Sequence, residues 1–100
     1  MIIRIFNTAI DPEEADRVRR IHRQVLVPAF ARFAGCHGIE MGLSLEEHSR
    51  DLVLLVAISQ WDSVAAIQQA TSSAEYAEAV SELRALFQEN PIVRHFESAG

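Results

Sequence analysis

The sequence contains no lysine, and all nine of its basic residues are arginines. Without a lysine amine, the chain cannot form a Schiff base with a carbonyl substrate or anchor pyridoxal phosphate. Cysteine is represented by Cys36 alone, which excludes an intrachain disulfide and a cysteine-based metal cluster. A lone cysteine also fits a reducing compartment, so we expect a cytoplasmic protein.

Long apolar runs and basic patches are missing as well. The longest apolar run, Leu52 to Ile58, is far too short to cross a bilayer as a helix. The first seven residues lack the basic flank, long apolar run and cleavage site of a signal peptide. The net charge is −5, and an acidic chain without a basic patch binds nucleic acid poorly. We therefore expect neither a membrane nor a nucleic acid as partner.

Hydrophobic residues make up 49% of the 100 residues, enough for one core, and we expect residues 1–100 to form a single domain. Periodicity and breakers predict a strand at 2–10, a helix at 11–33 that passes Pro28, strands at 38–45 and 52–58 joined by a polar turn, helices from Asp62 or Ser63 to Ala70 and at 74–88, and a strand at 92–97. This order predicts an α+β, ferredoxin-like split β-α-β fold. Its four-stranded antiparallel sheet would carry helices on one face.

The strand at 52–58 is apolar on both of its alternating faces. Helices on one side of a sheet cover only one of these faces, so something else must cover the other. A chain of 100 residues has no second domain to do this. We therefore expect a homodimer that pairs through the sheet face.

Several segments in a fixed order carry a family resemblance that covers nearly the whole chain. These segments are Asn7 in the first strand, Phe33-Ala34-Gly35-Cys36-His37-Gly38, Trp61-Asp62-Ser63 with Ala66-Ile67, Ser73-Ala74-Glu75-Tyr76, and Pro91-Ile92-Val93. In these residues the chain resembles the antibiotic biosynthesis monooxygenase (ABM) domains. The resemblance implies a ferredoxin-like subunit that pairs into a dimeric α+β barrel.

The resemblance also implies a chemistry, namely oxygen insertion into electron-rich phenols without a metal or a flavin. The carbanion of the substrate would reduce oxygen, while the protein binds the substrate, removes a proton and excludes water. Some relatives degrade haem with an Asn on the first strand and a Trp and a His on later helices, and the last two positions are Ala70 and Val80 here. We therefore expect no cofactor. No two histidines have the close spacing of a metal pair, so we expect no metal site.

Two polar residues are the candidate catalytic groups. His22 lies in the middle of the apolar stripe of the first helix, so it is either a general base in a pocket between helix and sheet or a neutral core histidine. Asn7 shares its strand face with Ile3 and Ile5. It either orients a phenolate or peroxide oxygen or ties neighbouring strands together as a structural amide.

The candidate substrate-binding residues are mostly aromatic. Trp61 and Tyr76 would wall a pocket, with core packing as the alternative, and Phe33 and Phe87 have the same two roles open to them. His95 could point into the barrel or into the pocket. The resulting prediction is a cofactor-independent monooxygenase for a small aromatic or polyketide-like substrate held between helices and sheet. The alternative is a non-catalytic dimeric module that binds a small ligand or is purely structural.

Overall fold

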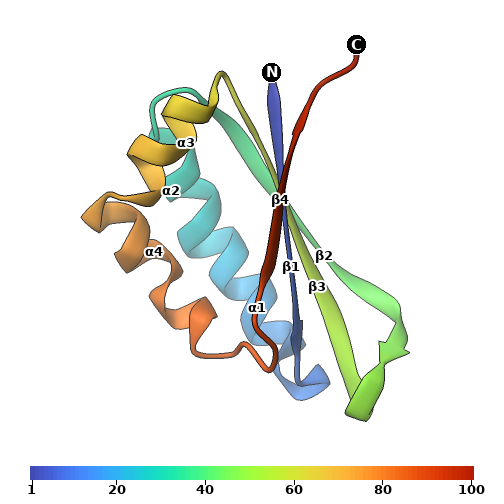
Figure 1. The fold of residues 1–100 in the computed structure, drawn as a ribbon. Helices are drawn as coiled ribbons and strands as arrows, with labels where there is room; N and C mark the ends of the chain where they lie inside the picture. The colour runs from blue at the N-terminus through green and yellow to red at the C-terminus, as the bar shows by residue number, and fades with distance from the viewer.

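The computed structural model describes residues 1–100 and contains one four-stranded antiparallel sheet with its helices on one face (Figure 1). The strands are β1 (Ile2–Ile10), β2 (Cys36–His48), β3 (Leu52–Trp61) and β4 (Ile92–Glu97), in the order β2-β3-β1-β4. This order and the antiparallel pairings confirm the predicted ferredoxin-like α+β fold. None of the helices combines the length and the apolar character needed to cross a membrane.

The helices begin where the sequence places capping residues. They are a 3-10 turn (Pro12–Glu14), α1 (Ala15–Ile21), a π-helical turn (His22–Leu26), α2 (Val27–Arg32), α3 (Val64–Thr71) and α4 (Ala74–Arg84). Asp11 accepts a hydrogen bond from the Glu13 N–H at 2.9 Å, just before Pro12. Ser63 and Ser73 cap α3 and α4 in the same way, each at 3.1 Å. Such caps satisfy amides that the first helical turn leaves unpaired.

The first long helix passes Pro28, as predicted, but the change in its backbone lies in the turn before the proline. There the Val27 N–H bonds to the carbonyl of His22, five residues back, and Val27 keeps helical dihedral angles. Pro28 has no N–H to donate to Gln24, so a regular α-helix would lose a bond at this point. The π-helical turn absorbs this mismatch and lets the helix continue into α2.

Three element boundaries differ from the prediction. The second strand runs over 36–48 rather than 38–45, the third reaches Trp61, and α4 ends at Arg84 instead of near 88. The longer β2 is paired with β3 through two irregular stretches that periodicity did not reveal. The resulting β2–β3 hairpin projects beyond the helices (Figure 1), and Leu45 on it is 98% exposed.

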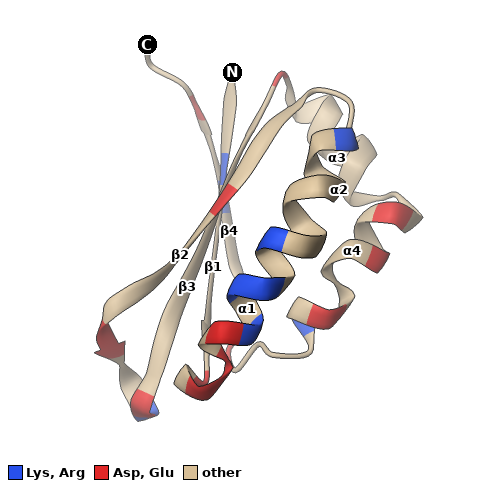
Figure 2. Cartoon of the chain, turned by 180° about the vertical axis from the view of Figure 1, so that it is seen from behind, with Lys and Arg blue, Asp and Glu red and all other residues tan.

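The two faces of the sheet have different surroundings. On the helical side, Leu55, Trp61 and Ile10 are fully buried against the helices. On the other side, Leu54, Ile58, Ile92 and Phe96 are 36–53% exposed. Figure 2 shows that charged residues gather on the helices and the hairpin tip, while the sheet carries few. One copy of the chain therefore leaves an apolar sheet face uncovered.

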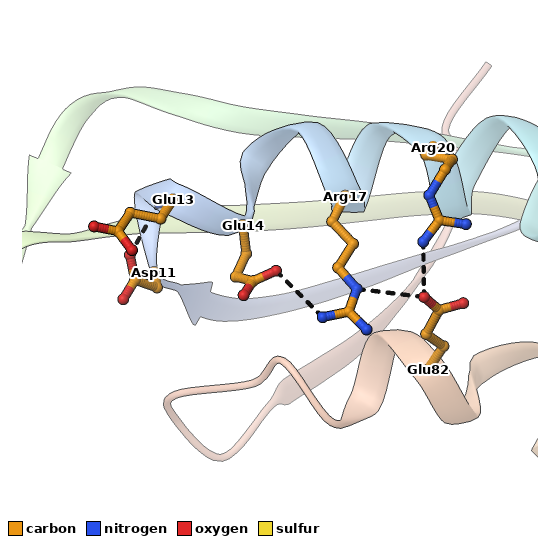
Figure 3. A network of polar contacts seen from close by, with 6 residues as sticks. All are labelled: Asp11, Glu13, Glu14, Arg17, Arg20 and Glu82. Carbon is orange, nitrogen blue, oxygen red and sulfur yellow. Dashed lines mark hydrogen bonds and ion pairs between the residues drawn. The ribbon is translucent and has the colours of Figure 1, made fainter.

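An ion-pair network joins the first and last helices (Figure 3). Glu82 of α4 accepts from Arg20 at 2.9 Å and from Arg17 at 3.4 Å, and Arg17 also reaches Glu14 at 3.6 Å. The hydrogen bond from Arg20 lowers the pKa of Glu82. Arg17 and Arg20 therefore form structural ion pairs that link α1 to α4.

Candidate functional site

A narrow slot lies between α4, the Phe30 region of α2 and the helical face of the sheet. Its walls are Phe6, Leu26, Phe30, Ile39, Ala57, Tyr76, Val80, Leu83 and Phe87, with Arg4, Ser59 and Arg84 as polar members. The slot has a volume of about 40 Å³. Because a water molecule needs roughly 10–15 Å³ on this scale, the slot holds three or four water-sized groups. It can take a substituent of a ligand, but not an aromatic ring.

The slot opens into a wider groove beside the C-terminal end of α4 and the segment before β4. This groove has a volume of about 770 Å³ and shares Arg4, Phe6, Tyr76, Arg84 and Phe87 with the slot. The rings of Phe6 and Phe87 lie 5.4 Å apart at 46° and form an aromatic wall where the two spaces meet. The groove therefore offers an apolar surface on which a planar ring can pack.

The polar end of the slot is a guanidinium next to a hydroxyl. Arg4 Nη1 donates a hydrogen bond to Tyr76 Oη at 3.3 Å, and Arg4 Nε is buried without a partner. Neither Arg4 nor Arg84 forms an ion pair with a carboxylate. The acid at the groove, Glu89, is bonded to His48 Nε2 at 3.1 Å. The site thus presents positive charge and unused donors within apolar walls.

Local structure explains how these residues meet. Arg4 and Phe6 alternate along β1 with the buried Thr8, so all three project toward the helices. Tyr76 lies in the first turn of α4, which the Ser73 cap fixes, and Arg84 lies in the last turn. The same helix therefore supplies both ends of the site.

The structure does not bring the two predicted catalytic residues together. Asn7 follows Phe6 on β1, so its side chain points to the uncovered face of the sheet, opposite the helices. It is paired in register with Val56 and Ile92. His22, in contrast, lies on the helical side. A single pocket that uses both Asn7 and His22 is therefore not formed within one chain.

His22 borders a separate open groove between the first helix and the edge strand β2. This groove has a volume of about 470 Å³ and is lined in part by Met41 and Leu43. Burial lowers the pKa of His22, and the nearby Glu40 carboxylate opposes that shift. The Nδ1 atom is buried and has no hydrogen-bond partner. His22 thus keeps one ring nitrogen without a protein partner, and it does not line the slot.

The predicted aromatic residues divide into two groups. Tyr76 and Phe87 line both the slot and the groove. Trp61 is fully buried, donates to Ser59 Oγ at 2.8 Å, and stacks on Phe33 with ring centroids 6.5 Å apart. Trp61 and Phe33 therefore have the core role that was the alternative for both.

His95 lies on β4 as the cross-strand partner of Arg4, so it shares the helical face of the sheet. It is exposed and does not line the slot or the groove. Cys36 is half-buried, and burial raises the pKa of its thiol, which keeps it a poor nucleophile. No cluster of three or more histidine, cysteine, aspartate or glutamate side chains has a metal-binding arrangement.

Sequence reasoning assigned no substrate contact to Arg4, Phe6 or Arg84, which all line the slot. The sequence does mark Arg4 as unusual, because it is a charged residue in a largely apolar strand and shares a strand face with Phe6 and Thr8. Nothing marks Arg84 in the same way, since an arginine in the last turn of a helix is ordinarily a response to the helix dipole.

Comparisons with known proteins agree with this fold. A candidate antibiotic biosynthesis monooxygenase from Bordetella bronchiseptica is 25% identical, with a TM-score of 0.77 and coverage of 98% of this chain and 96% of that one. A candidate antibiotic biosynthesis monooxygenase from Deinococcus radiodurans is 16% identical, with a TM-score of 0.76 and coverage of 100% and 94%. A comparison with curated proteins finds no significant match.

The sequence itself assigns the family. The model of the family "Antibiotic biosynthesis monooxygenase" matches residues 1–82, which include β1, the first helices, the β2–β3 hairpin and most of α4. The chain therefore belongs to the antibiotic biosynthesis monooxygenase family.

Proposed function

We propose that this protein is a cofactor-independent monooxygenase that oxidises a small hydroxyaromatic or polyketide-like molecule bound at the slot and groove. The observation that carries the proposal is the apolar slot with the Arg4–Tyr76 pair at its polar end, in a chain of the monooxygenase family. The ring of the substrate packs against Phe6 and Phe87, and one substituent enters the slot.

The reaction needs no electron donor besides the substrate. An activated CH₂ group next to a hydroxylated ring loses a proton to water in the open groove, and the carbanion passes one electron to oxygen. The radical pair combines into a peroxide anion, which takes up one proton in place of the one that was lost. The resulting hydroperoxide loses water and leaves a carbonyl, so CH₂ and O₂ become C=O and H₂O. The guanidinium of Arg4 favours the anionic form of the substrate, and the apolar walls of the slot keep bulk water out.

The proposal assigns separate roles to the predicted residues. Tyr76 and Phe87 touch the substrate, and His95 lies at the outer rim next to Arg4 in register. Trp61 and Phe33 hold Phe30 and Tyr76 in place through their ring contacts. Asn7 and His22 lie outside the slot and have no assigned role in the reaction.

Oxygen uptake on a hydroxylated anthrone such as dithranol tests the proposal, with enzyme-free autoxidation subtracted. We expect Tyr76→Phe and Phe87→Ala to lower the enzymatic rate by about tenfold or more, since each removes a contact at the reacting molecule. Arg23→Gln, an exposed arginine outside the slot, should leave the rate unchanged. If His22→Gln abolishes uptake while both slot variants retain it, the reaction takes place elsewhere.

A non-catalytic binding module is the second candidate function. The observation in its favour is that neither an imidazole nor a carboxylate lines the slot, so no ordinary general base faces the substrate there. This candidate predicts saturable binding of hydroxyaromatics that quenches or shifts Trp61 fluorescence without any oxygen uptake above background.

We also propose that two copies pair through the uncovered face of the sheet. Four strands about 4.8 Å apart and some 30 Å long make a face of roughly 600 Å² in plan. This is comparable with the approximately 800 Å² that each partner contributes to a standard interface. Leu54, Ile58 and Phe96 would form its apolar centre.

A further inference from the structure

Arg4 and Arg84 are cations without counter-ions in a chain that is short of cations. Arg17, Arg19 and Arg20 have carboxylate partners, whereas the other six arginines have none, and of these six Arg4 alone is not exposed. Arg4 is only partly exposed, contacts the Tyr76 hydroxyl, and keeps a buried Nε without an acceptor. A buried guanidinium N–H that has no protein acceptor is costly, so a ligand that brings an acceptor oxygen to Arg4 Nε would be favoured.

We propose that the slot binds an anionic oxygen group, a carboxylate or an ionised phenol, carried on an aromatic ring. The anion lies in the slot against Arg4 and Tyr76, the ring lies in the groove against Phe6 and Phe87, and Arg84 stands at the mouth. That the ring is oxidised depends on the proposed monooxygenase function. That its substituent is negatively charged depends only on the residues that line the slot.

The size of the slot fits this group. Its volume of about 40 Å³ has room for a small group such as a carboxylate or a phenolate oxygen, but not for a ring. The groove outside has ample room for one or two fused rings. A ligand therefore enters with its small charged end first.

The donors fit an anion better than a neutral polar group. A guanidinium presents its N–H groups in a planar fork that matches the two oxygens of a carboxylate. The Tyr76 hydroxyl accepts from Arg4, so its own proton is free to donate to the ligand. Glu89 is engaged by His48 at the groove and does not neutralise Arg4. A carboxamide of the same shape would leave the charge of Arg4 unpaired, and the site should reject it.

Isothermal titration calorimetry of the whole chain with matched probes tests this proposal. The first pair is naphthalene carboxylate and the neutral naphthalene carboxamide, and the second is nitrophenolate and the neutral nitroanisole. We expect each anion to bind about tenfold or more tightly than its neutral partner at low salt, with the preference reduced at high salt. Arg4→Gln should remove the preference, and Arg84→Gln should weaken it less because Arg84 is exposed.

Arg23→Gln is the matched control, since it removes one exposed positive charge outside the site and should keep the preference intact. Circular dichroism of each variant shows whether the fold is retained, and Arg4→Met serves as a second variant if Arg4→Gln unfolds. Equal binding within the pairs, a preference that survives Arg4→Gln, or no binding of either anion overturns the proposal. If the protein binds the anions selectively but shows no oxygen uptake, the monooxygenase function is refuted and the anion site stands. If it consumes oxygen with an uncharged substrate and shows no preference for anions, the anion site is refuted and the monooxygenase function stands.

Discussion

At the scale of single residues, His22 gives a prediction that follows from its burial. Burial holds the pKa of His22 below the ordinary value of 6.5, against the opposing effect of Glu40. The unfolded chain therefore binds a proton on this residue at a higher pH than the folded chain does. The contribution of the neutral imidazole to stability is complete above pH 6.5 and is lost as the pH falls below that value.

We therefore expect the unfolding midpoint of the wild type to fall more than that of His22→Gln between about pH 8 and pH 5. Urea denaturation at a series of pH values measures this difference, because all other titrating groups are shared. Glu40→Gln should steepen the loss in the wild-type background, since it removes the carboxylate that favours the protonated imidazole. Parallel pH profiles for wild type and His22→Gln would show that the imidazole is not held in its neutral form.

Residue-scale sequence reasoning named Tyr76 and Phe87, which line the slot, and Asn7 and His22, which do not. Helical spacing correctly placed His22 on the side of its helix that faces the sheet, near Met41 and Leu43. Periodicity cannot show where along the sheet a helical residue lies, and His22 is over the edge strand while the slot is under α4. Asn7 was assigned to its correct strand face, with Ile3 and Ile5. Which face the helices cover is a property of tertiary packing, and it turned out to be that of Arg4 and Phe6.

At the scale of elements, the turn between α2 and β2 depends on Gly35. Its φ of +78° is a conformation that other residues adopt with strain, and a Cβ on Gly35 would lie 2.8 Å from the Ala66 Cβ of α3. The Gly35 carbonyl also accepts the Asp62 N–H at 2.8 Å, which ties this turn to the start of α3. We expect Gly35→Ala to lower the free energy of unfolding by about 2 kcal/mol or more, measured by urea denaturation.

A double-mutant cycle separates the two causes. Ala66→Gly removes the colliding methyl group but costs about 1 kcal/mol on its own, because it places a glycine within α3. In the Gly35→Ala background it should therefore cost less than this, or even restore stability. If the two substitutions add with no coupling, the collision is relieved by backbone movement and only the conformational strain remains.

Element-scale prediction worked where a local signal fixes the structure. Asp11-Pro12 begins the first helix as its capping chemistry indicates, and Ser63, one of the two expected cap residues, begins α3. Sequence-based prediction of helix boundaries was wrong where contacts with other elements determine the boundary. The end of α4 at Arg84 is set by packing of the following segment on β1, where the Gln88 N–H bonds to the carbonyl of Ala9 at 2.8 Å. The π-helical turn before Pro28 was equally inaccessible, since a proline alone does not show how its missing bond is compensated.

At the scale of the whole molecule, the uncovered sheet face leads to the last prediction. Leu54 and Ile58 lie on the central strand β3 and are still 37% and 36% exposed. We expect the wild type to sediment with twice the mass of one chain. Pairing would bury the apolar sheet face that the helices leave exposed to water. Ile58→Glu, which places a charge at the centre of the interface, should give a monomer, whereas Val64→Glu on exposed α3 should leave the dimer intact. A monomeric wild type in analytical ultracentrifugation at micromolar concentration would refute the pairing. If both variants stay dimeric, another surface forms the contact.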